Sequence, residues 1–340
     1  MRVGLNPVKD QQEAETTYYH QVVVPVYIPD EEGYFEHGVT ILKYCLESLF
    51  KTSHPRTFIT VVNNGSHEGV AEYLETLYRQ EQIHELIHTR NIGKINAVFK
   101  GSSGHRFPLV TVSDADVLFL NGWQEATYAV FKEFPKTGCV TTTPNPKLLK
   151  YHTAPILGRY LFSGKLRFVP PKDTEALTHF AESIGAPDFY RSCHMSNVLR
   201  LEGKETHAVL GAGHFVATYR GHLLTEQEVA YSEYKLGGLS VRQHLDQPVA
   251  DQGYWRLATE ANHTYHMGNV AEAWMLERLR QLEDDSNHEI PLPELGTSRR
   301  GVRTRIGRWM VEKLLLRKPF WTWFLQQKGL SKKDAACYSN

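Results

Sequence analysis

The stretch Pro108–Leu120, PLVTVSDADVLFL, places two carboxylates between two apolar runs. Asp114 and Asp116 follow one β-branched run and precede another. Carboxylates are depleted in strands and costly to bury without a partner, so a bound cation is one explanation for the pair. A tight turn is the other, because Ser and Asp are ordinary turn residues. The short motif alone favours the turn, so the choice depends on the rest of the chain.

Short apolar strands alternate with amphipathic helices around this motif. The pattern predicts strands at 21–29, 57–66, 83–89 and 107–113, and helices at 39–50, 68–78 and from about 91. This alternation predicts an α/β fold whose Rossmann-like, mostly parallel sheet carries helices on both faces. Ligands bind beyond the carboxyl ends of the strands in such sheets. The loops at 25–27 and 63–66 should therefore meet Asp114 and Asp116 in one crevice.

The second half of the chain is less regular. We expect strands at 138–146, 214–220 and 262–269, and a short helix at Asp251–Glu260. Asn269 should cap the next helix, with Glu272 completing a capping box. A proline-rich linker at 288–298 then leads from a main domain, residues 1–288, into a C-terminal extension, residues 289–340.

The composition is that of a soluble globular protein. Of the 340 residues, 41% are hydrophobic and 22% are charged, and no apolar run has the character of a signal peptide or the length of a membrane span. We therefore expect a cytoplasmic protein. The cysteines lie far apart without a C-x-x-C, which predicts reduced thiols and neither a disulfide framework nor a zinc ribbon. They are Cys45, Cys139, Cys193 and Cys337.

Charge is segregated along the chain although the formal net charge is zero. From Pro291 onward there are 11 Lys and Arg against 3 Asp and Glu. Within this part, Ser298–Phe324 has the pattern of a basic amphipathic helix with tryptophans, which can lie on an anionic membrane surface. The alternative is a helix packed on the main domain, and the two are compatible. No aromatic stacking platform accompanies the charge, so we expect no nucleic-acid partner.

The order of these elements, with the segments VVNNGS, NIGKINA and SDAD, resembles the family 2 glycosyltransferases of the GT-A fold. These are inverting enzymes that use nucleotide-sugar donors. The resemblance implies a GT-A catalytic domain at 1–288, with a nucleotide-sugar half at about 20–120 and an acceptor half at about 121–288, followed by a basic helical extension at 289–340. It also implies the residues that contact the nucleotide. They are Pro25, Tyr27, Asn63 in place of the usual base-contacting aspartate, Asn64, Asn91, Gly93 and Lys94.

The same resemblance identifies Asp114 and Asp116 as the D-x-D motif of the family. A diphosphate leaving group gains negative charge, and a hard divalent ion held by carboxylates stabilises it. We expect Asp116 to coordinate Mn²⁺ or Mg²⁺ directly, and Asp114 to reach the ion through water or to hold the ribose. His266 is a candidate third ligand. Gly213, in the loop Gly211–Gly213, is expected beside the donor sugar, although a simple turn explains these glycines equally well.

Asp251 occupies the place where the family carries the acidic residue that deprotonates the acceptor hydroxyl. One carboxylate suffices for general-base catalysis. The residue could instead cap the adjacent helix, and Asp246 is the competing base. The implied reaction moves a sugar from a UDP-sugar, or from a GDP-sugar, to a hydroxyl of a glycan or lipid-linked acceptor. Such a role in polysaccharide biosynthesis would suit a peripheral protein at the inner face of the membrane.

Three other classes of protein are weaker matches. A nucleotidyltransferase with this sheet should carry a glycine-rich basic loop after its first strand, and PVYIPDEEGYF lacks one. A phosphatase that uses D-x-D as its nucleophile needs Thr or Val where this chain has Leu118. A non-catalytic protein that binds carbohydrate or nucleotide sugars remains, and it predicts binding without transfer.

Overall fold

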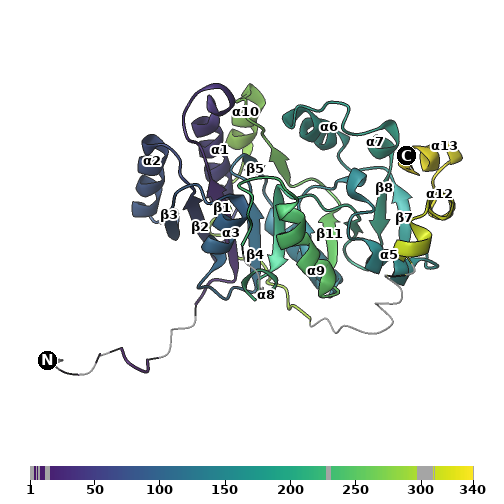
Figure 1. The fold of residues 1–340 in the computed structure, drawn as a ribbon, viewed down its shortest axis with the longest axis horizontal. Coiled ribbons are helices and arrows are strands. Elements are labelled where there is room, and N and C mark those ends of the chain that lie inside the picture. Colours follow the sequence, from purple (N-terminus) through teal and green to yellow (C-terminus); the bar gives the residue numbers. More distant parts are fainter. Residues whose placement is uncertain are drawn as a thin grey trace.

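A ten-stranded sheet forms the centre of the molecule, with the strand order β3-β2-β1-β4-β10-β6-β11-β9-β8-β7 (Figure 1). The computed structural model describes residues 16–226, 231–296, 309 and 311–339, together with 4, 6 and 8–11. Helices cover both faces of the sheet, which confirms the α/β class.

The first half of the chain builds the parallel part of the sheet. Its strands are β1 (His20–Val26), β2 (Thr57–Asn63), β3 (Glu85–His88) and β4 (Leu109–Ser113), connected through α1 (Gly38–Lys51), α2 (Glu68–Arg79) and α3 (Lys94–Ser102). Successive side chains of β1 point to opposite faces, so Val22 and Val24 share a core with α1 whereas Val23 shares one with α3. All the strands and helices predicted for this half are present. Strands buried on both faces leave continuous apolar runs in the sequence, which is why they are predictable.

The second half adds mostly antiparallel strands. After α4 (Trp123–Glu133), the sheet continues with β6 (Thr137–Thr141), β10 (Val216–Arg220), β11 (Trp255–Thr259), β9 (Ala208–Val209), β8 (Val198–Leu201) and β7 (Leu166–Val169). Strand β10 runs antiparallel to β4 and β6, whereas β11 is parallel to β6. A separate two-stranded sheet pairs β5 (Val117–Phe119) with β12 (Thr264–His266). This pairing brings the D-x-D turn beside a segment from the far end of the main domain.

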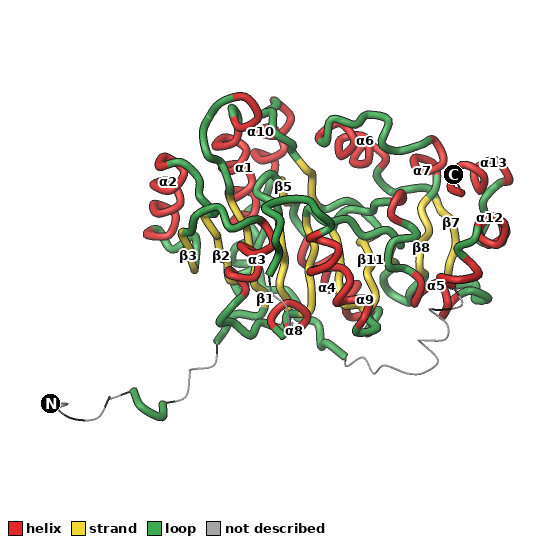
Figure 2. The backbone as a smooth tube through the Cα atoms, in the orientation of Figure 1, coloured by secondary structure: helices red, strands yellow, loops and turns green. Residues whose placement is uncertain are grey.

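Short helices connect the strands of the second half (Figure 2). They are α5 (Ala154–Tyr160), α6 (Thr174–Ser183), α7 (Ser192–Ser196), α8 (His222–Thr225), a π-helical turn at Arg242–Asp246 that leads into α9 (Gln247–Asp251), and α10 (Ala273–Gln281). Single 3-10 turns lie at Gly33–Phe35 and Pro146–Leu148.

Two local expectations for this half are wrong. The segment Asp251–Glu260 is not a helix, because α9 ends at Asp251 and the following residues form the fully buried strand β11 between β6 and β9. The neighbours of β11 are strands distant in the sequence, so the hydrophobic periodicity of residues 251–260 does not indicate a strand. Asn269 does not cap the next helix. The N-cap of α10 is Glu272, while the Asn269 side-chain amide donates to Tyr34 O at 3.2 Å.

The C-terminal extension packs on the second half of the main domain. It contains a π-helical turn (Val311–Leu315), α12 (Lys318–Gln327) and α13 (Lys332–Ser339). Trp321 and Phe324 are fully buried and share a core with residues of β8 and β11. Of the helix expected at 298–324, residues 298–308 and 310 lie outside the described residues. The packing alternative therefore holds for the part of the extension that the structure describes.

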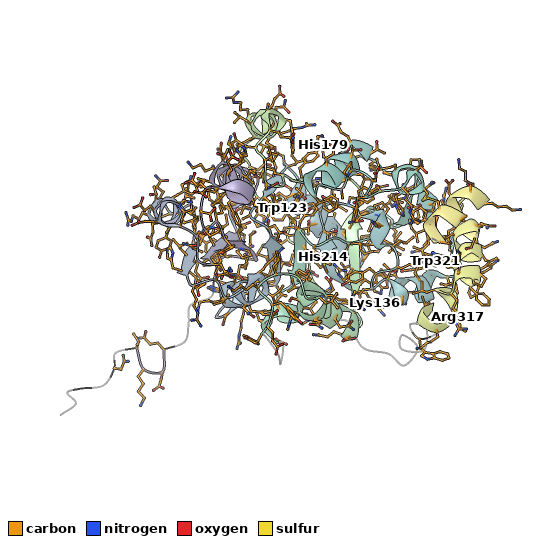
Figure 3. All side chains as sticks on the ribbon, turned by 45° about the horizontal axis from the view of Figure 1, so that its top comes forward. Trp123, Lys136, His179, His214, Arg317 and Trp321 are labelled. Atoms are coloured by element: carbon orange, nitrogen blue, oxygen red, sulfur yellow. A yellow bond between two sulfur atoms is a disulfide. The ribbon has the colours of Figure 1, made fainter. Side chains whose placement is uncertain are left out.

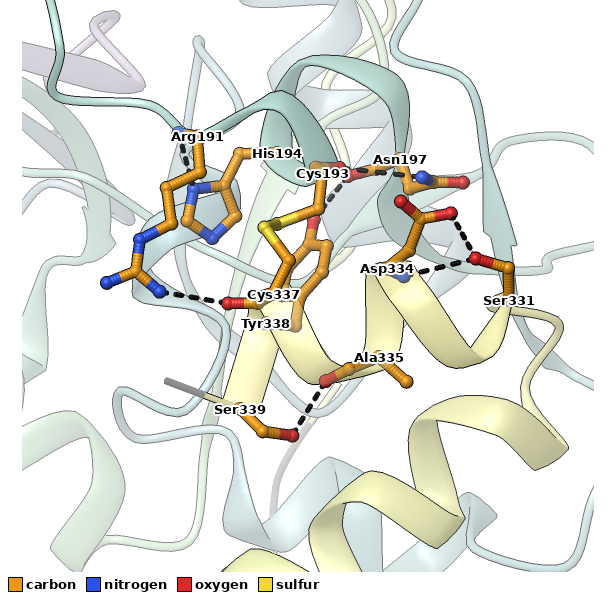
Figure 4. Close-up of a disulfide and its surroundings, with 10 residues drawn as sticks. All are labelled: Arg191, Cys193, His194, Asn197, Ser331, Asp334, Ala335, Cys337, Tyr338 and Ser339. Carbon is orange, nitrogen blue, oxygen red and sulfur yellow. Dashed lines mark hydrogen bonds between the residues drawn. A yellow bond between two sulfur atoms is a disulfide. The ribbon is translucent and has the colours of Figure 1, made fainter.

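A disulfide fastens the extension to the main domain (Figure 4). It joins Cys193 of α7 to Cys337 of α13 across a sequence separation of 144, which corrects the expectation that all four cysteines are reduced. Arg191 donates to Cys337 O at 2.9 Å beside the bond. Cys45 and Cys139 are free and buried, as expected. Cysteine spacing alone could not reveal the pair, because it depends on the chain returning to α7 at its far end.

Within the described part of the chain, no helix combines the length and the apolar character that crossing a membrane requires.

Candidate active site

A cavity of about 510 Å³ lies at the carboxyl ends of β1, β2 and β4. The three loops predicted to converge do so here, since each contributes to the cavity lining. Seven of the predicted nucleotide and metal residues line it, namely Pro25, Tyr27, Asn64, Asn91, Lys94, Asp114 and Asp116. The volume lies in the range of small-molecule binding sites.

Asn63, Gly93 and Gly213, the other residues predicted to bind the donor, are not among the residues that line the cavity. Asn63 is buried at 4% exposure behind Asn64, where its amide nitrogen faces His88 Nδ1 at 3.1 Å and its oxygen accepts from Ser66 N at 2.9 Å. Gly93 precedes α3 with a φ of 91°, and a Cβ there would lie 2.8 Å from Tyr234 O. These residues shape the loops that carry the cavity wall.

Asp114, Asp116 and His266 form one cluster. One ligand atom from each residue lies within 4.8 Å of the others. The β5–β12 pairing places them together, because His266 pairs with Val117, next to Asp116, and Met267 N donates to Asp116 O at 2.7 Å. Lys94 forms an ion pair with Asp114 Oδ1. The cluster therefore combines two carboxylates, one imidazole and one ammonium group.

The hydrogen bonds of His266 orient its free nitrogen toward the carboxylates. The Ser183 hydroxyl donates to Phe180 O at 2.8 Å, so its oxygen accepts from His266 Nδ1 at 2.9 Å. This assigns the proton to Nδ1 and leaves the Nε2 lone pair facing Asp116 Oδ2 at 3.4 Å. A proton or a metal ion bound by both atoms removes the repulsion between two acceptors that face each other. A metal-binding histidine fixed through its other nitrogen is the usual arrangement in metal sites.

The surroundings of Asp116 support the same conclusion. Its Oδ1 is buried and has no hydrogen-bond partner among the described residues. Burial raises the pKa of Asp116 above its ordinary value, and Asp114 adds to this, whereas His266 and Lys94 oppose it. An ionised carboxylate in such a place needs a counter-ion. Two carboxylates with one imidazole are a fitting donor set for Mn²⁺, so the residues present fit a divalent metal.

Further residues of the cavity were not predicted as site residues from the sequence, among them Tyr34, Phe35, Lys235 and Leu236. Tyr34 and Phe35 extend the aromatic wall begun by Tyr27, whose ring lies 5.9 Å from that of Phe35. Lys235 and Leu236 close the opposite side, where Lys94 N donates to Lys235 O at 2.8 Å. An exposed aromatic in the loop after β1 gave a weak signal. Nothing local signals Lys235 and Leu236, because their place depends on a loop from the second half of the chain.

The two candidate bases lie at different depths in the fold. Asp251 is exposed at the end of α9, just before Trp255, whose N–H donates to Lys136 O at the amino edge of β6. The D-x-D cluster lies at the opposite, carboxyl edge, and a five-residue strand such as β4 spans about 16 Å. The structure therefore does not bring Asp251 to the cluster. Asp246 is fully buried and contacts His214, Tyr151 and Arg256.

The cavity and the metal-type cluster lie at the carboxyl ends of the parallel strands, where open α/β sheets bind their ligands. The profile of the family described as Glycosyl transferase family 2 matches residues 22–195, slightly more than half of the chain. The chain belongs to this family and is a glycosyltransferase. No curated protein matches it in sequence.

Several solved structures resemble the chain at low identity. S. aureus TarS 1–349 in complex with UDP-GlcNAc is 12% identical over 94% of this chain and 70% of its own, with a TM-score of 0.41. The mannosyltransferase PcManGT from Pyrobaculum calidifontis, in complex with GDP-Man and Mn²⁺, is 13% identical over 97% of this chain and 89% of its own, with a TM-score of 0.43.

Proposed function

We propose that this glycosyltransferase moves a sugar from a nucleotide-diphospho-sugar to the hydroxyl of a glycan or lipid-linked acceptor, with inversion and with a divalent metal. The observation that carries the proposal is the cluster of Asp114, Asp116 and His266, whose ligand atoms lie within 4.8 Å of one another and whose two aspartates line the cavity. A donor bound in the cavity would present its diphosphate to this cluster.

Different residues of the site would bind different parts of the donor. Asp116, Asp114 and His266 would hold Mn²⁺ or Mg²⁺, which supplies Lewis-acid stabilisation of the departing diphosphate. Lys94 adds positive charge at the same point. The side-chain oxygens of Asn64 and Asn91 accept from backbone N–H groups, at 2.9 and 3.1 Å, so their amide nitrogens remain to donate to the nucleotide. The ring of Tyr27, 41% exposed, offers a face to the nucleobase.

The donor is proposed to carry UDP, with GDP as the other candidate. TarS has been solved with UDP-GlcNAc and PcManGT with GDP-Man, so both nucleotides are natural probes. Asn63 does not resolve the choice, because its polar atoms are engaged by His88 and Ser66. Inversion follows from a single displacement, in which the acceptor attacks the face of the sugar opposite the diphosphate.

Thermal shift with nucleotide sugars tests this function directly. We expect UDP-GlcNAc or GDP-mannose to raise the melting temperature in the presence of Mn²⁺ and much less in EDTA, because a ligand that binds the folded state stabilises it. Release of the nucleotide diphosphate separates an enzyme from a non-catalytic binding protein. If no nucleotide sugar shifts the melting temperature with either metal, the proposed function fails.

We also propose that the extension contacts an anionic membrane surface near a lipid-linked acceptor. Trp309, Phe320 and Trp323 are exposed at 58, 55 and 47%, beside Lys313, Arg317 and Lys318. Each basic residue near such a surface contributes about 1 kcal/mol. Full-length protein should sediment with phosphatidylserine vesicles and be released by salt. Trp323→Ala should weaken this several-fold, and no sedimentation at low salt would exclude the membrane partner.

A further inference from the structure

We propose that His214, oriented by Asp246, is the general base that takes the proton from the acceptor hydroxyl. This inference rests on the proposed function and names a residue for it that the D-x-D cluster does not include. It replaces the exposed Asp251, which lies at the opposite edge of the sheet.

His214 lies at the carboxyl edge of the sheet beside the cluster. The next residue, Phe215, accepts from Asp114 N at 2.8 Å, and its ring lies 5.5 Å from that of His266. His214 is therefore one residue from a direct contact with the D-x-D turn without touching a metal ligand. Figure 3 shows it near the middle of the molecule. It directly precedes β10, which pairs with β4 of the first half and β6 of the second.

One nitrogen of the imidazole faces a buried carboxylate at ion-pair distance. His214 Nδ1 lies 3.3 Å from Asp246 Oδ2, and the Asp246 side chain is fully buried. The Nδ1 atom is itself buried, although 35% of the His214 side chain is exposed. The exposed area therefore belongs to the rest of the side chain, which includes the ring edge that carries Nε2. A buried acceptor at Nδ1 and an open Nε2 are the arrangement that a histidine base requires.

The residue before His214 borders open space. A Cβ added at the preceding residue, Gly213, would meet no heavy atom within 4 Å. Gly213 belongs to the loop that the family resemblance places beside the donor sugar. An acceptor that enters here would approach the sugar from the side of the second half of the chain, across from the nucleotide cavity.

Asp246 remains ionised, as a group that stabilises an imidazolium must. Burial acts to raise its pKa, but Arg256 at 2.8 Å, together with His214 and Tyr151, outweighs burial and holds the pKa below its ordinary value. Arg242 also faces this group across the Tyr151 ring. Arg256, Tyr151 and Arg242 therefore surround the pair of His214 and Asp246 from three separate segments. The contacts of the described residues place none of these three side chains on Nε2 of His214.

The proposed step conserves atoms and charge. The acceptor oxygen forms a bond to the anomeric carbon while the bond from that carbon to the diphosphate breaks, and the diphosphate leaves with the electron pair. The hydroxyl proton moves to His214 Nε2. The resulting imidazolium is stabilised by Asp246 and returns its proton to solvent through the exposed edge of the ring.

Donor hydrolysis by the full-length protein tests this assignment, because water serves as the acceptor. With the nucleotide sugar that stabilises the protein most, and with saturating Mn²⁺, His214→Gln should bind the donor within about twofold of wild type. Its hydrolysis rate should fall about 10²- to 10⁴-fold, the usual contribution of a general base. In His214→Ala, added imidazole should restore part of the rate, which a purely structural histidine would not allow.

His207 supplies a matched control. It lies 3.4 Å from Glu202 and its side chain is 32% exposed, but it belongs to a surface loop before β9. His207→Gln should keep the wild-type rate, and His207→Ala should not respond to imidazole. Near-normal hydrolysis by folded His214→Gln, or a loss of donor binding equal to the loss of rate, would overturn the assignment. Failure of wild type to bind any nucleotide sugar would instead overturn the proposed function.

Discussion

The two halves of the sheet differ in whether their charged side chains have partners. At the carboxyl edge of the first half, Asp116 faces the lone pair of His266 and keeps a buried oxygen without a partner among the described residues. In the second half, Arg200 is paired with Glu202 at 2.6 Å and with Glu260 at 2.8 Å. Groups that satisfy one another stabilise the fold, whereas groups left unsatisfied at the edge of a sheet indicate a ligand.

The halves also differ in how their cores are closed. The core between β1 and α1 is built mainly by the first half, with side chains added from α6, β10, β12 and α10. The core of the second half depends on α12, α13 and the Cys193–Cys337 disulfide. Substitutions in the first half should therefore affect ligand binding, and substitutions in the C-terminal helices should affect stability.

The largest expected effect is on the unsatisfied cluster. Asp116→Asn removes the negative charge while keeping the shape, and a Lewis-acid cation contributes several kcal/mol to such reactions. Transfer should fall at least about a thousandfold, and Mn²⁺ should no longer enhance donor binding in thermal shift. Asp251→Asn, the matched control at the opposite edge, should stay within about twofold of wild type. Undiminished turnover by a folded Asp116→Asn protein would show that the D-x-D motif is a simple turn without a role in metal binding.

The second effect concerns stability alone. Cys337→Ser opens a loop of 144 residues, and loss of a disulfide typically costs about 2–5 kcal/mol. The midpoint of urea unfolding should fall while the dissociation constant for the donor stays unchanged. Dithiothreitol should lower the urea midpoint of the wild-type protein and leave the midpoint of Cys337→Ser unchanged. A parallel loss of donor affinity would show that the two halves are more tightly coupled than their cores indicate.

The smallest expected effect comes from removing a hydrogen bond that supports the metal ligand His266. Ser183→Ala removes the acceptor that fixes His266 Nδ1, and such supporting contacts are worth about 10- to 100-fold in metal affinity. The Mn²⁺ concentration needed for half-maximal activity should rise by that factor at an unchanged melting temperature. Thr178→Ala, on the same helix α6 with its hydroxyl bonded to Thr174 O, should have no effect. Equal behaviour of the two variants would remove His266 from the metal site.

The first half of the fold could be predicted from the sequence because the apolar pattern of each strand and helix shows which of its faces are buried. The apolar runs before Asn63 and Asp114 are long enough to identify strands, and their loops converge because parallel strands end at one edge. The Asp114, Asp116 and His266 cluster was likewise predictable through the family resemblance. Seven residues that the resemblance implied line one cavity, and the strand pattern alone predicted only that their loops would meet.

The rest depends on contacts that no local pattern records. Trp255–Thr259 is a strand because β6 and β9 lie on either side of it, not because of its own periodicity. Ser183 reaches His266 from a helix that precedes it by a long stretch of chain. Cys337 meets Cys193 only after the C-terminal helices have packed. Such pairings are set by tertiary structure, which overrides local preference.

The burial of Trp321 and Phe324 beneath β8 and β11 has a consequence for synthesis on the ribosome. The nucleotide-binding strands and their helices emerge early and can pack before translation ends, since domains fold as they appear, at about 5–20 residues per second. The second half must wait for α12 and α13 and meanwhile exposes the apolar surface that they will cover. A nascent chain of this protein is therefore most dependent on chaperones between the emergence of β11 and the packing of α12 and α13.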